Sequence, residues 1–346
     1  MLQSIKEIID AVKVSKSFKD FFRGVSFVTP NGKVHFLKIK SVNPSYRGAG
    51  YRWVKYSMVT QLEYASGEFI YGYGESDVEI LALQKSIAEA VERAAFILVC
   101  TEQFPNVGAT TNGWAAHISP KKARASAQGE LLERDAVLLH WLSQTPLIRI
   151  DDASLPKALS KWQSQELSEA TRYRFAKFFI STLGNAPTAS AMIHDGYGYG
   201  FISHGAGTSL EEALNRALAE TCRIADLAVK GVLTRTSEVV PKTPEDHAVF
   251  YASENAFPCW IDEGSTTSFS FAMNRWTKKL NEESAPVHFA FDEYTCGPLS
   301  IARCRSRDVQ DLYFGPTALN SGVINSFRIK NVSGVEKLNP LPHFVP

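Results

Sequence analysis

The chain has 346 residues, of which 45% are hydrophobic and 21% are charged, and its formal net charge is +1. This length and apolar content can build a substantial core, in about two domains or one large one. No run of about 18 apolar residues is present, and the first residues mix charged with apolar side chains, so neither a membrane helix nor a secretory signal is predicted. The five cysteines include no Cys-x-x-Cys pair, which argues against a disulfide framework and a structural zinc site. We therefore expect a cytoplasmic protein with no membrane partner.

The first 60 residues are basic, with 11 Lys or Arg against 3 Asp or Glu. A nucleic-acid-binding module would gather these charges on one helix or interleave them with stacking aromatic residues. Here they alternate with apolar residues over residues 33–40, a pattern that a solvated strand face explains better. No nucleic-acid partner is expected.

In chain order, the sequence first predicts a helix over residues 3–22, followed by two pairs of strands, the first pair joined at an Asn-Gly turn. These strands are expected at residues 25–29, 33–42, 52–64 and 68–73. At Ser76 the hydrophobic period changes from two residues to about 3.6. Ser76 and Glu79 form a capping-box pattern, which predicts the start of a helix of about twenty residues.

A second capped helix is expected at Ser119 and Pro120, because Ser suits the N-cap and Pro the first helical position. A third is expected after Ser209, with Glu212 completing its capping box. Further strands are expected at residues 147–150, 174–182, 190–193, 200–203, 287–291 and 300–306. A short helix is expected near residues 317–326. Because strands and helices are segregated rather than alternating, the predicted fold class is α+β, with mixed or antiparallel sheets.

Five glutamates lie within these three helices, and arginines lie beside them. The glutamates are Glu89, Glu92, Glu130, Glu133 and Glu220, and the arginines are Arg93, Arg134 and Arg216. Residues three or four apart share one face of a helix, so each Glu-x-x-Glu-Arg unit can aim two carboxylates and a guanidinium in one direction. Taken singly, each pair is explained by a solvated helix face. Together they fall in helices rich in Ala, Leu, Val and Ile, where charge is usually avoided, which favours a functional role.

This combination predicts a site for Mg²⁺ and a polyphosphate. Mg²⁺ prefers an octahedron of oxygen ligands and usually takes only one or two carboxylates, so five glutamates indicate more than one ion. Arg134 and Arg216 can offset the charge of a terminal phosphate, with ion pairs inside the helices as the alternative. No Gly-x-x-x-x-Gly-Lys-Ser/Thr loop is present, so a P-loop is excluded. Four glycines ahead of helix starts could let backbone amides approach phosphate: Gly72, Gly74, Gly205 and Gly207.

Several motifs, in this order, resemble the YcaO family. They are residues 86–93 (SIAEAVER), 111–117 (TNGWAAH), 130–135 (ELLERD) and 216–220 (RALAE). The resemblance spans about residues 70–230 and continues to the carboxyl end. It implies one YcaO-type domain without a P-loop over residues 1–346. Its expected parts are a basic β-rich part at 1–70, an ATP- and Mg²⁺-binding core at 70–235, and a part at 236–346 that ends in a proline-rich tail.

The resemblance implies an ATP-dependent peptide cyclodehydratase of the azoline-forming, microcin synthetase-like branch. In such enzymes a Cys, Ser or Thr of a ribosomally made precursor peptide adds to the preceding carbonyl. ATP then phosphorylates the resulting oxygen, and phosphate leaves to give a thiazoline or oxazoline. The implied partners are the precursor peptide, a leader-peptide-binding protein and a flavin-dependent dehydrogenase, and a homodimer stays open. Thioamide or amidine formation, and a non-catalytic nucleotide-binding scaffold, are the alternatives.

The resemblance also assigns roles to single residues. All five glutamates would bind Mg²⁺ and, through it, ATP. Arg134 and Arg216 would contact phosphate and take part in catalysis, and Ser86 and Asn112 would contact the nucleotide.

Residues 340–346 (PLPHFVP) resemble the proline-rich tail of the azoline-forming branch, where the terminal carboxylate is proposed to assist proton transfer. Pro346 is therefore a candidate catalytic residue, with an ordinary disordered terminus as the alternative. Two positions depart from the family pattern: Arg223 stands where many relatives have Gln, and Ile118 where a small or polar residue is common.

Overall fold

The computed structural model describes residues 16–44, 56–65, 67–76, 78–103, 110–157, 159, 175–195, 200–229, 246–247, 265–281, 287–320, 322, 324–334, 337–340 and 343. The chain divides into two compact units, each assembled from segments that are separate in the sequence. Unit 1 comprises Met1–Gly48, Arg52–Glu130 and Phe289–Arg305, and unit 2 comprises Ala49–Tyr51, Leu131–His288 and Ser306–Pro346. The division falls inside helix α4 (Pro120–Ser143), after Glu130. The expected single domain with parts at 1–70, 70–235 and 236–346 stays a prediction.

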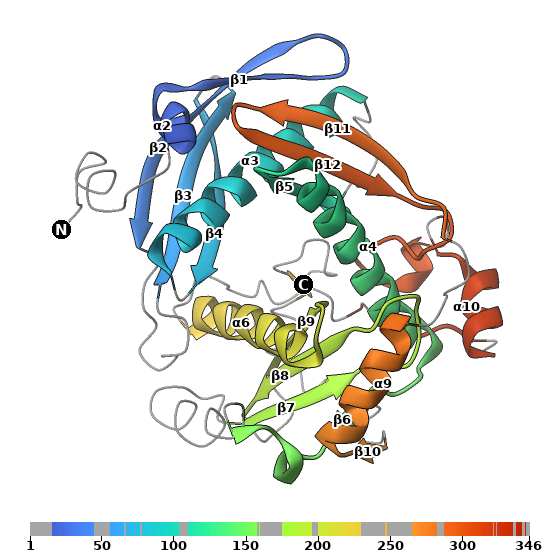
Figure 1. Cartoon of the computed structure of the whole chain (residues 1–346). Helices are drawn as coiled ribbons and strands as arrows, with labels where there is room; N and C mark the ends of the chain where they lie inside the picture. Colours follow the sequence, from blue (N-terminus) through green and yellow to red (C-terminus); the bar gives the residue numbers. More distant parts are fainter. Residues whose placement is uncertain are drawn as a thin grey trace. The chain divides into compact units, whose positions relative to one another are not determined.

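Unit 1 is built on a seven-stranded sheet of order β4-β3-β2-β1-β11-β12-β5, in which all neighbouring strands are antiparallel. Its strands are β1 (Val25–Val28), β2 (Val34–Pro44), β3 (Tyr56–Ala65), β4 (Glu68–Ser76), β5 (Trp114–His117), β11 (Ala290–Cys296) and β12 (Leu299–Arg305). Helices α2 (Lys16–Arg23) and α3 (Glu79–Gln103) bury apolar faces against this sheet, and α3 contacts β3, β4 and β5 (Figure 1).

Unit 2 contains a five-stranded sheet of order β10-β6-β7-β8-β9, antiparallel except where β10 pairs with β6. Its strands are β6 (Ile148–Ile150), β7 (Phe175–Ile180), β8 (Ala189–His194), β9 (Gly200–Gly205) and β10 (Thr266–Thr267). Its described helices are the part of α4 after Glu130, α6 (Leu210–Val229), α9 (Phe269–Asn281), α10 (Ser326–Ser333) and the short 3-10 turns η1 (Asp152–Ser154) and η2 (Thr317–Asn320). Helix α6 packs on β8 and β9.

The α+β fold class with antiparallel and mixed sheets is confirmed, as are most expected elements. The first hairpin turns at Gly32, whose φ is 84°, and the Thr29 N–H donates to the Lys33 carbonyl across it (3.0 Å). The Ser119 carbonyl accepts the first hydrogen bond of α4, from Ala123 (2.9 Å). At α6 the Ser209 hydroxyl accepts from the Glu212 N–H (3.1 Å), as the capping box predicts.

Some expected elements are wrong. Ser76 is not an N-cap: it ends β4, its hydroxyl accepts from the Val78 N–H (3.2 Å), and the carbonyl of Val78 starts α3. Helix α9 was not predicted, and the helix expected at 317–326 is η2, with α10 beginning where that range ends. Residues 3–15 and 52–55 of two expected elements lie outside the described residues. Among the described helices, none has the length and apolar character that a membrane crossing requires.

Candidate functional site

In unit 1 three of the predicted metal ligands act on one another. Glu89 and Glu92 lie one turn apart on α3, and Glu130 lies on α4. Burial, with the negative charges of Glu130 and Glu89, raises the pKa of Glu92 well above its ordinary value, although Arg93 and a backbone N–H lower it. The charged form of this carboxylate is therefore disfavoured, first by burial and then by its two acidic neighbours. We refer to Glu89, Glu92 and Glu130 as the acidic cluster.

Backbone N–H groups from the two edge strands of the unit 1 sheet orient the carboxylates of α3. From β4, Tyr73 N–H donates to Glu89 Oε2 (2.6 Å), and from β5, Ala116 N–H donates to Glu92 Oε2 (3.3 Å). Arg93 pairs with Glu89 (2.5 Å) on the same helix. Since β4 and β5 lie at opposite ends of the sheet order, α3 is fixed at both edges.

Glycines of β4 let α3 lie directly on the sheet. A Cβ at Gly74 would overlap the Ala82 carbonyl oxygen, and one at Gly72 would overlap the backbone of Ala90 and Ser86. These two glycines therefore serve helix-sheet packing, whereas the sequence suggested an approach to phosphate. Because Gly72 and Gly74 have no side chains, the acidic face of α3 lies within hydrogen-bonding reach of the β4 backbone.

Ser86 and Asn112, both predicted to contact nucleotide, have different surroundings. Ser86 is fully buried, its hydroxyl donates to the Leu83 carbonyl (2.9 Å), and it lies 2.7 Å from the Thr60 hydroxyl, so it joins α3 to β3. Asn112 lies in the turn before β5, and both polar atoms of its amide are buried with no hydrogen-bond partner among the described residues. Leaving such atoms unpaired costs free energy, so Asn112 is suited to a polar ligand group.

In unit 2 the predicted carboxylate ligands lie among guanidinium groups. Burial raises the pKa of Glu133 to about 7, with a further increase from the charge of Glu220. Arg134, a hydrogen bond from the Ala206 N–H, and Arg216 lower the pKa of Glu133. The structure thus brings together, within unit 2, four of the predicted ligand residues.

The start of α6 holds Arg216 in place. Its guanidinium pairs with Glu212 (2.6 Å) and donates to the Ala206 carbonyl (3.1 Å). Gly205 allows this approach of loop and helix, because a Cβ there would overlap the Ala213 carbonyl oxygen. The i,i+4 ion pair with Glu220, considered as the alternative role for Arg216, is replaced by the pair with Glu212.

The structure also shows where Arg223 and Ile118, the two departures from the family pattern, lie. Arg223 lies one turn after Glu220 on α6 and pairs with its carboxylate at 3.4 Å. A guanidinium therefore lies against a predicted metal ligand. Ile118 is exposed after β5.

Asp135 is a further important residue, which the sequence analysis quoted only as part of a motif. Its side chain is fully buried. Its carboxylate accepts hydrogen bonds from both terminal nitrogens of Arg328 (2.5 and 2.7 Å) and from the Gln310 N–H (2.7 Å). This anchors α4 directly after Arg134. A charge ahead of the apolar run that ends α4 was the available signal, whereas Arg328, 193 residues later, gave none.

His204 on β9 is a second residue to which the sequence assigned no role in the site. Its Nδ1 lies 2.8 Å from the Ser190 hydroxyl. Burial, with the positive charges of Arg134 and His343, lowers the pKa of His204 well below its ordinary value. A neutral imidazole therefore lies within electrostatic range of Arg134.

Carboxylate oxygens are ligands that Mg²⁺ prefers, and a divalent cation would relieve the repulsion that raises the pKa of Glu92. The carboxylate oxygens of these glutamates are therefore chemically suited to bind Mg²⁺. No three His, Cys, Asp or Glu side chains converge closely enough to hold one metal ion within the part of the chain that the structure describes. The grouping of all five glutamates into one site stays a prediction. Pro346 lies outside the described residues.

Comparisons with known proteins give a family and a fold. The model of a family described as YcaO cyclodehydratase, ATP- and Mg²⁺-binding, matches residues 94–290, more than half of the chain. This match includes Glu130, Glu133 and Glu220 and begins just after Glu92. A search of curated proteins finds no match for the chain.

Solved structures share the fold at low sequence identity. YcaO from Methanopyrus kandleri, bound with AMPPCP and Mg²⁺, is 14% identical, with 79% of this chain and 86% of that chain covered and a TM-score of 0.57. A heterocyclase in complex with substrate and cofactor is 12% identical, with 88% and 54% covered and a TM-score of 0.58. The E. coli microcin synthetase McbBCD complex with pro-MccB17 bound is 11% identical, with 79% and 88% covered and a TM-score of 0.52.

Proposed function

Because the chain belongs to the YcaO family, we propose that it is an ATP-dependent peptide cyclodehydratase. It would convert Cys, Ser or Thr of a ribosomally made precursor peptide to thiazoline or oxazoline. The observation that supports this most strongly is that the family match spans Glu130, Glu133, Arg134, Arg216 and Glu220. Burial raises the pKa of Glu92 and of Glu133, and neighbouring carboxylates raise both further, so each is a buried acid whose charged form a bound cation would stabilise.

ATP and Mg²⁺ are the cofactors that the family description names. ATP supplies a phosphoryl group that turns an amide oxygen into a leaving group, and Mg²⁺ neutralises phosphate charge. Carboxylates of the acidic cluster would bind Mg²⁺ one or two at a time, with those of Glu89 and Glu92 oriented by the N–H groups of Tyr73 and Ala116. The unpaired amide of Asn112 would bind a polar group of the nucleotide.

The arginines of unit 2 would bind phosphate oxygens. Arg216 is held by Glu212 and the Ala206 carbonyl, so its guanidinium is already ordered. Arg134 is adjacent to Asp135, whose buried pair with Arg328 fixes this part of α4. Ordered guanidinium groups lose little entropy when they bind an anion, which favours tight and oriented binding.

In the proposed reaction the side-chain sulfur or oxygen bonds to the carbonyl carbon of the preceding residue and loses its proton. The carbonyl oxygen then takes the terminal phosphoryl group, its bond to carbon breaks, and the amide nitrogen loses its proton as the C=N bond forms. The products are azoline, ADP and phosphate, so the peptide loses the atoms of one water. Pro346 stays the candidate proton acceptor, through a carboxylate.

The proposed partners are the precursor peptide, a leader-peptide-binding protein and a flavin-dependent dehydrogenase. The fold similarity to the McbBCD complex with pro-MccB17 bound supports a multi-protein assembly of this type. Genes beside the one for this chain would identify these partners directly.

The test replaces Glu89 or Glu130 with Gln, which keeps size and removes charge. With a precursor peptide encoded beside the gene, both variants should lose peptide-dependent phosphate release and the loss of one water from the peptide. Glu211→Gln, at an exposed position on α6, is the matched control and should keep wild-type turnover. Unchanged turnover in both site variants would contradict the proposal, and exchange of oxygen for sulfur in the product would indicate thioamide formation instead.

A further inference from the structure

We propose that unit 1 carries a groove that binds an extended peptide strand. The groove lies where β1 and β11 diverge, and its volume is about 850 Å³. Strands β1, β11 and β12 supply most of its lining, including Ser26, Val28, Glu293, Thr295 and Arg303. No member of the acidic cluster lines it, so it is a separate feature of the unit.

The pairing of the strands creates an open edge. Strand β1 pairs with β2 at four positions and β11 pairs with β12 at seven, but β1 and β11 pair only at Phe27 and Cys296 among the described residues. Figure 1 shows β1 and β11 close together at the carboxyl end of β11 and diverging from there. Residues 290–295 of β11 therefore have a strand partner on one side, within the part of the chain that the structure describes.

An open edge of this kind is a template for another strand. At about 3.3 Å per residue, residues 290–295 offer an edge of roughly 20 Å. Backbone N–H and C=O groups along such an edge bind an extended chain by completing the sheet, and pockets for alternate side chains add specificity. The occupant that fits is therefore a peptide in extended conformation rather than a helix or a small molecule.

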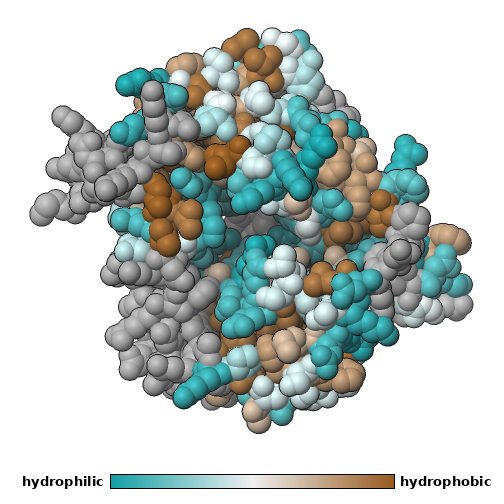
Figure 2. Space-filling model, viewed as in Figure 1, coloured by the Kyte–Doolittle hydropathy of each residue, from teal (hydrophilic) through white to brown (hydrophobic). Residues whose placement is uncertain are grey.

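Exposed apolar side chains lie beside the groove on the β1–β2 hairpin, and one of them, Val28, also lines it. Val28 is 51% exposed, its cross-strand partner Val34 is 63% exposed, and Phe36, opposite Ser26, is 58% exposed. These three form an apolar surface on the outer face of the hairpin, and hydrophobic residues gather at that margin of the molecule in Figure 2. Apolar side chains of a bound peptide would contact this surface.

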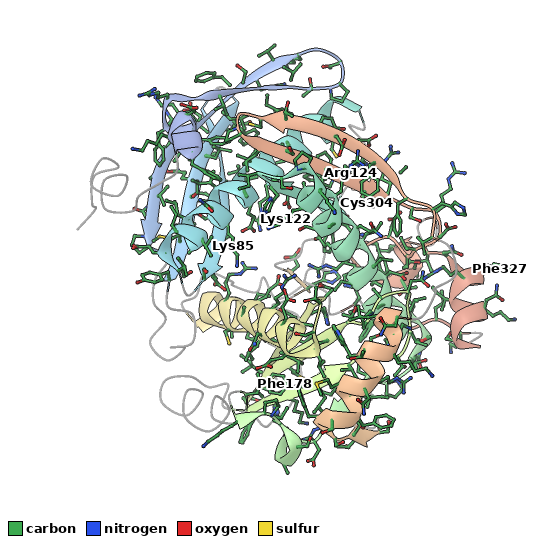
Figure 3. The ribbon with its side chains drawn as sticks, in the orientation of Figure 1. Lys85, Lys122, Arg124, Phe178, Cys304 and Phe327 are labelled. Carbon is green, nitrogen blue, oxygen red and sulfur yellow. The ribbon has the colours of Figure 1, made fainter. Side chains whose placement is uncertain are left out.

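The charged side chains on the opposite side are paired with one another. Asp292 pairs with Arg305 (2.9 Å), and Glu293 accepts from Arg124 (2.8 Å), a residue labelled beside these strands in Figure 3. Because these charges balance, the groove gives no strong preference for a charged ligand. Backbone pairing and apolar contacts would supply most of the binding free energy.

The occupant that we assign is a stretch of the precursor peptide outside the residue being modified. An enzyme that modifies single residues of a longer peptide must hold the remainder of that peptide somewhere, and an extended strand is the form that an open sheet edge accepts. This assignment rests on the proposed function, whereas binding of a strand to β11 does not.

The test uses the purified full chain without ATP and a library of random dodecapeptides displayed on phage. Enriched peptides are synthesised and their affinity is measured by fluorescence anisotropy. Val28→Lys puts a charge into the groove and should weaken binding by about tenfold or more, since an inward-pointing charge blocks strand addition. Val78→Lys is the matched control, because Val78 is 48% exposed, close to the 51% of Val28, and belongs neither to the groove nor to the apolar surface of the hairpin. N-methylation of alternate backbone amides should abolish binding in one register and leave it intact in the other.

Equal affinity for wild type and Val28→Lys, or unchanged affinity after N-methylation in both registers, would overturn the proposal. So would the failure of any peptide to be enriched. A wild-type dimer that Val28→Lys converts to a monomer would assign the groove to a second copy of the chain instead. Because no ATP is present, loss of peptide binding cannot be confused with loss of the proposed ATP-dependent turnover.

Discussion

The two units of the chain position their predicted ligand residues by the same means but balance charge differently. In each, a helix bearing carboxylates lies directly on a strand with glycines: α3 on β4 through Gly72 and Gly74, and α6 on β9 through Gly205. In unit 1 the charges that act on Glu92 are two other carboxylates and one guanidinium, that of Arg93. The immediate surroundings of Glu92 therefore have an excess of negative charge.

Around Glu133 and along α6 in unit 2, three carboxylates lie with three guanidinium groups. The carboxylates are Glu133, Glu212 and Glu220, and the guanidinium groups are Arg134, Arg216 and Arg223. The difference teaches that one way of packing a helix on a sheet can serve two purposes. The acidic cluster has more carboxylates than its one neighbouring guanidinium can balance and suits Mg²⁺, whereas Arg216 is ordered by its own partners and suits phosphate.

The largest expected effect concerns the buried ion pair of unit 2. Arg328→Ala leaves Asp135, which is 0% exposed, without its guanidinium, and should lower the free energy of unfolding by about 3–5 kcal/mol. Arg305→Ala is the control in unit 1, because Arg305 is 52% exposed in its pair with Asp292, and should cost about 0–1 kcal/mol. Urea unfolding measures both. Equal losses would show that burial does not distinguish these pairs.

A second prediction separates the roles of the two charge arrangements. Glu92→Gln removes a repelled carboxylate, so it should lower turnover roughly 10²–10³-fold while raising the melting temperature of the metal-free protein. The reason for the stabilisation is that ionised Glu92 is disfavoured in the folded state, as its raised pKa shows.

Binding measurements sharpen this prediction. Glu92→Gln should weaken Mn²⁺ binding followed by electron paramagnetic resonance, and Arg216→Gln should mainly weaken AMPPCP binding followed by calorimetry. If both variants lose metal binding and nucleotide binding to the same extent, the proposed division of roles is wrong. In that division the acidic cluster binds the metal and Arg216 binds phosphate.

Acid should destabilise unit 2 through its buried imidazoles. Burial lowers the pKa of His140 and of His247 to about 4, and each Nε2 accepts backbone N–H groups: His140 from Thr182 (2.9 Å) and Leu183 (3.1 Å), His247 from Gly315 (2.9 Å). Since an unfolded histidine titrates near pH 6.5, the stability that these neutral rings contribute is present above about pH 6.5 and is lost as the pH falls toward 4.

Protonation of Glu133 has the opposite effect on the stability of the folded state. The pKa of this carboxyl group is raised to about 7, so protonation as the pH falls from 7 favours the folded state, but it opposes three buried histidines, His140, His247 and His204. The expected net loss of unfolding free energy between pH 6.5 and 4 is on the order of a few kcal/mol, measured as urea midpoints against pH. His140→Gln, which keeps an acceptor but cannot titrate, should flatten this dependence, and Glu133→Gln should steepen it. An unaltered slope in His140→Gln would count against the role of this imidazole.

The sequence predicted the local features of the fold well, because turn and cap signals act within a few residues. The Asn-Gly turn before β2 and the caps at Ser119 and Ser209 are examples. Ser76 failed because pairing with Tyr56 extends β4 to that residue, so a tertiary contact overrides the capping pattern. For α9 the signal was present and was missed, since the Ser268 hydroxyl accepts from the Phe271 N–H (3.3 Å).

The glutamates were predictable as candidates because spacing along a helix fixes which residues share a face. Their partners were not, since each comes from another segment: Tyr73 for Glu89 and Ala116 for Glu92. The same holds for Arg328, the partner of Asp135. The sequence also could not show that Glu212, rather than Glu220, would pair with Arg216, because both lie four residues away on the same helix. Only the fold of the loop before α6 decides between them.

The smallest expected effect tests the two serines that looked alike in the sequence. Ser209→Ala removes the acceptor for the Glu212 N–H and should cost about 1 kcal/mol of unfolding free energy. Ser76→Ala, at the end of β4, removes a bond to Val78 that caps no helix, and should cost clearly less. Because Glu212 also holds Arg216, Ser209→Ala should weaken AMPPCP binding slightly, whereas Ser76→Ala should leave it unchanged. Equal effects of the two substitutions on stability and binding would mean that the cap of α6 does not order the arginine of unit 2.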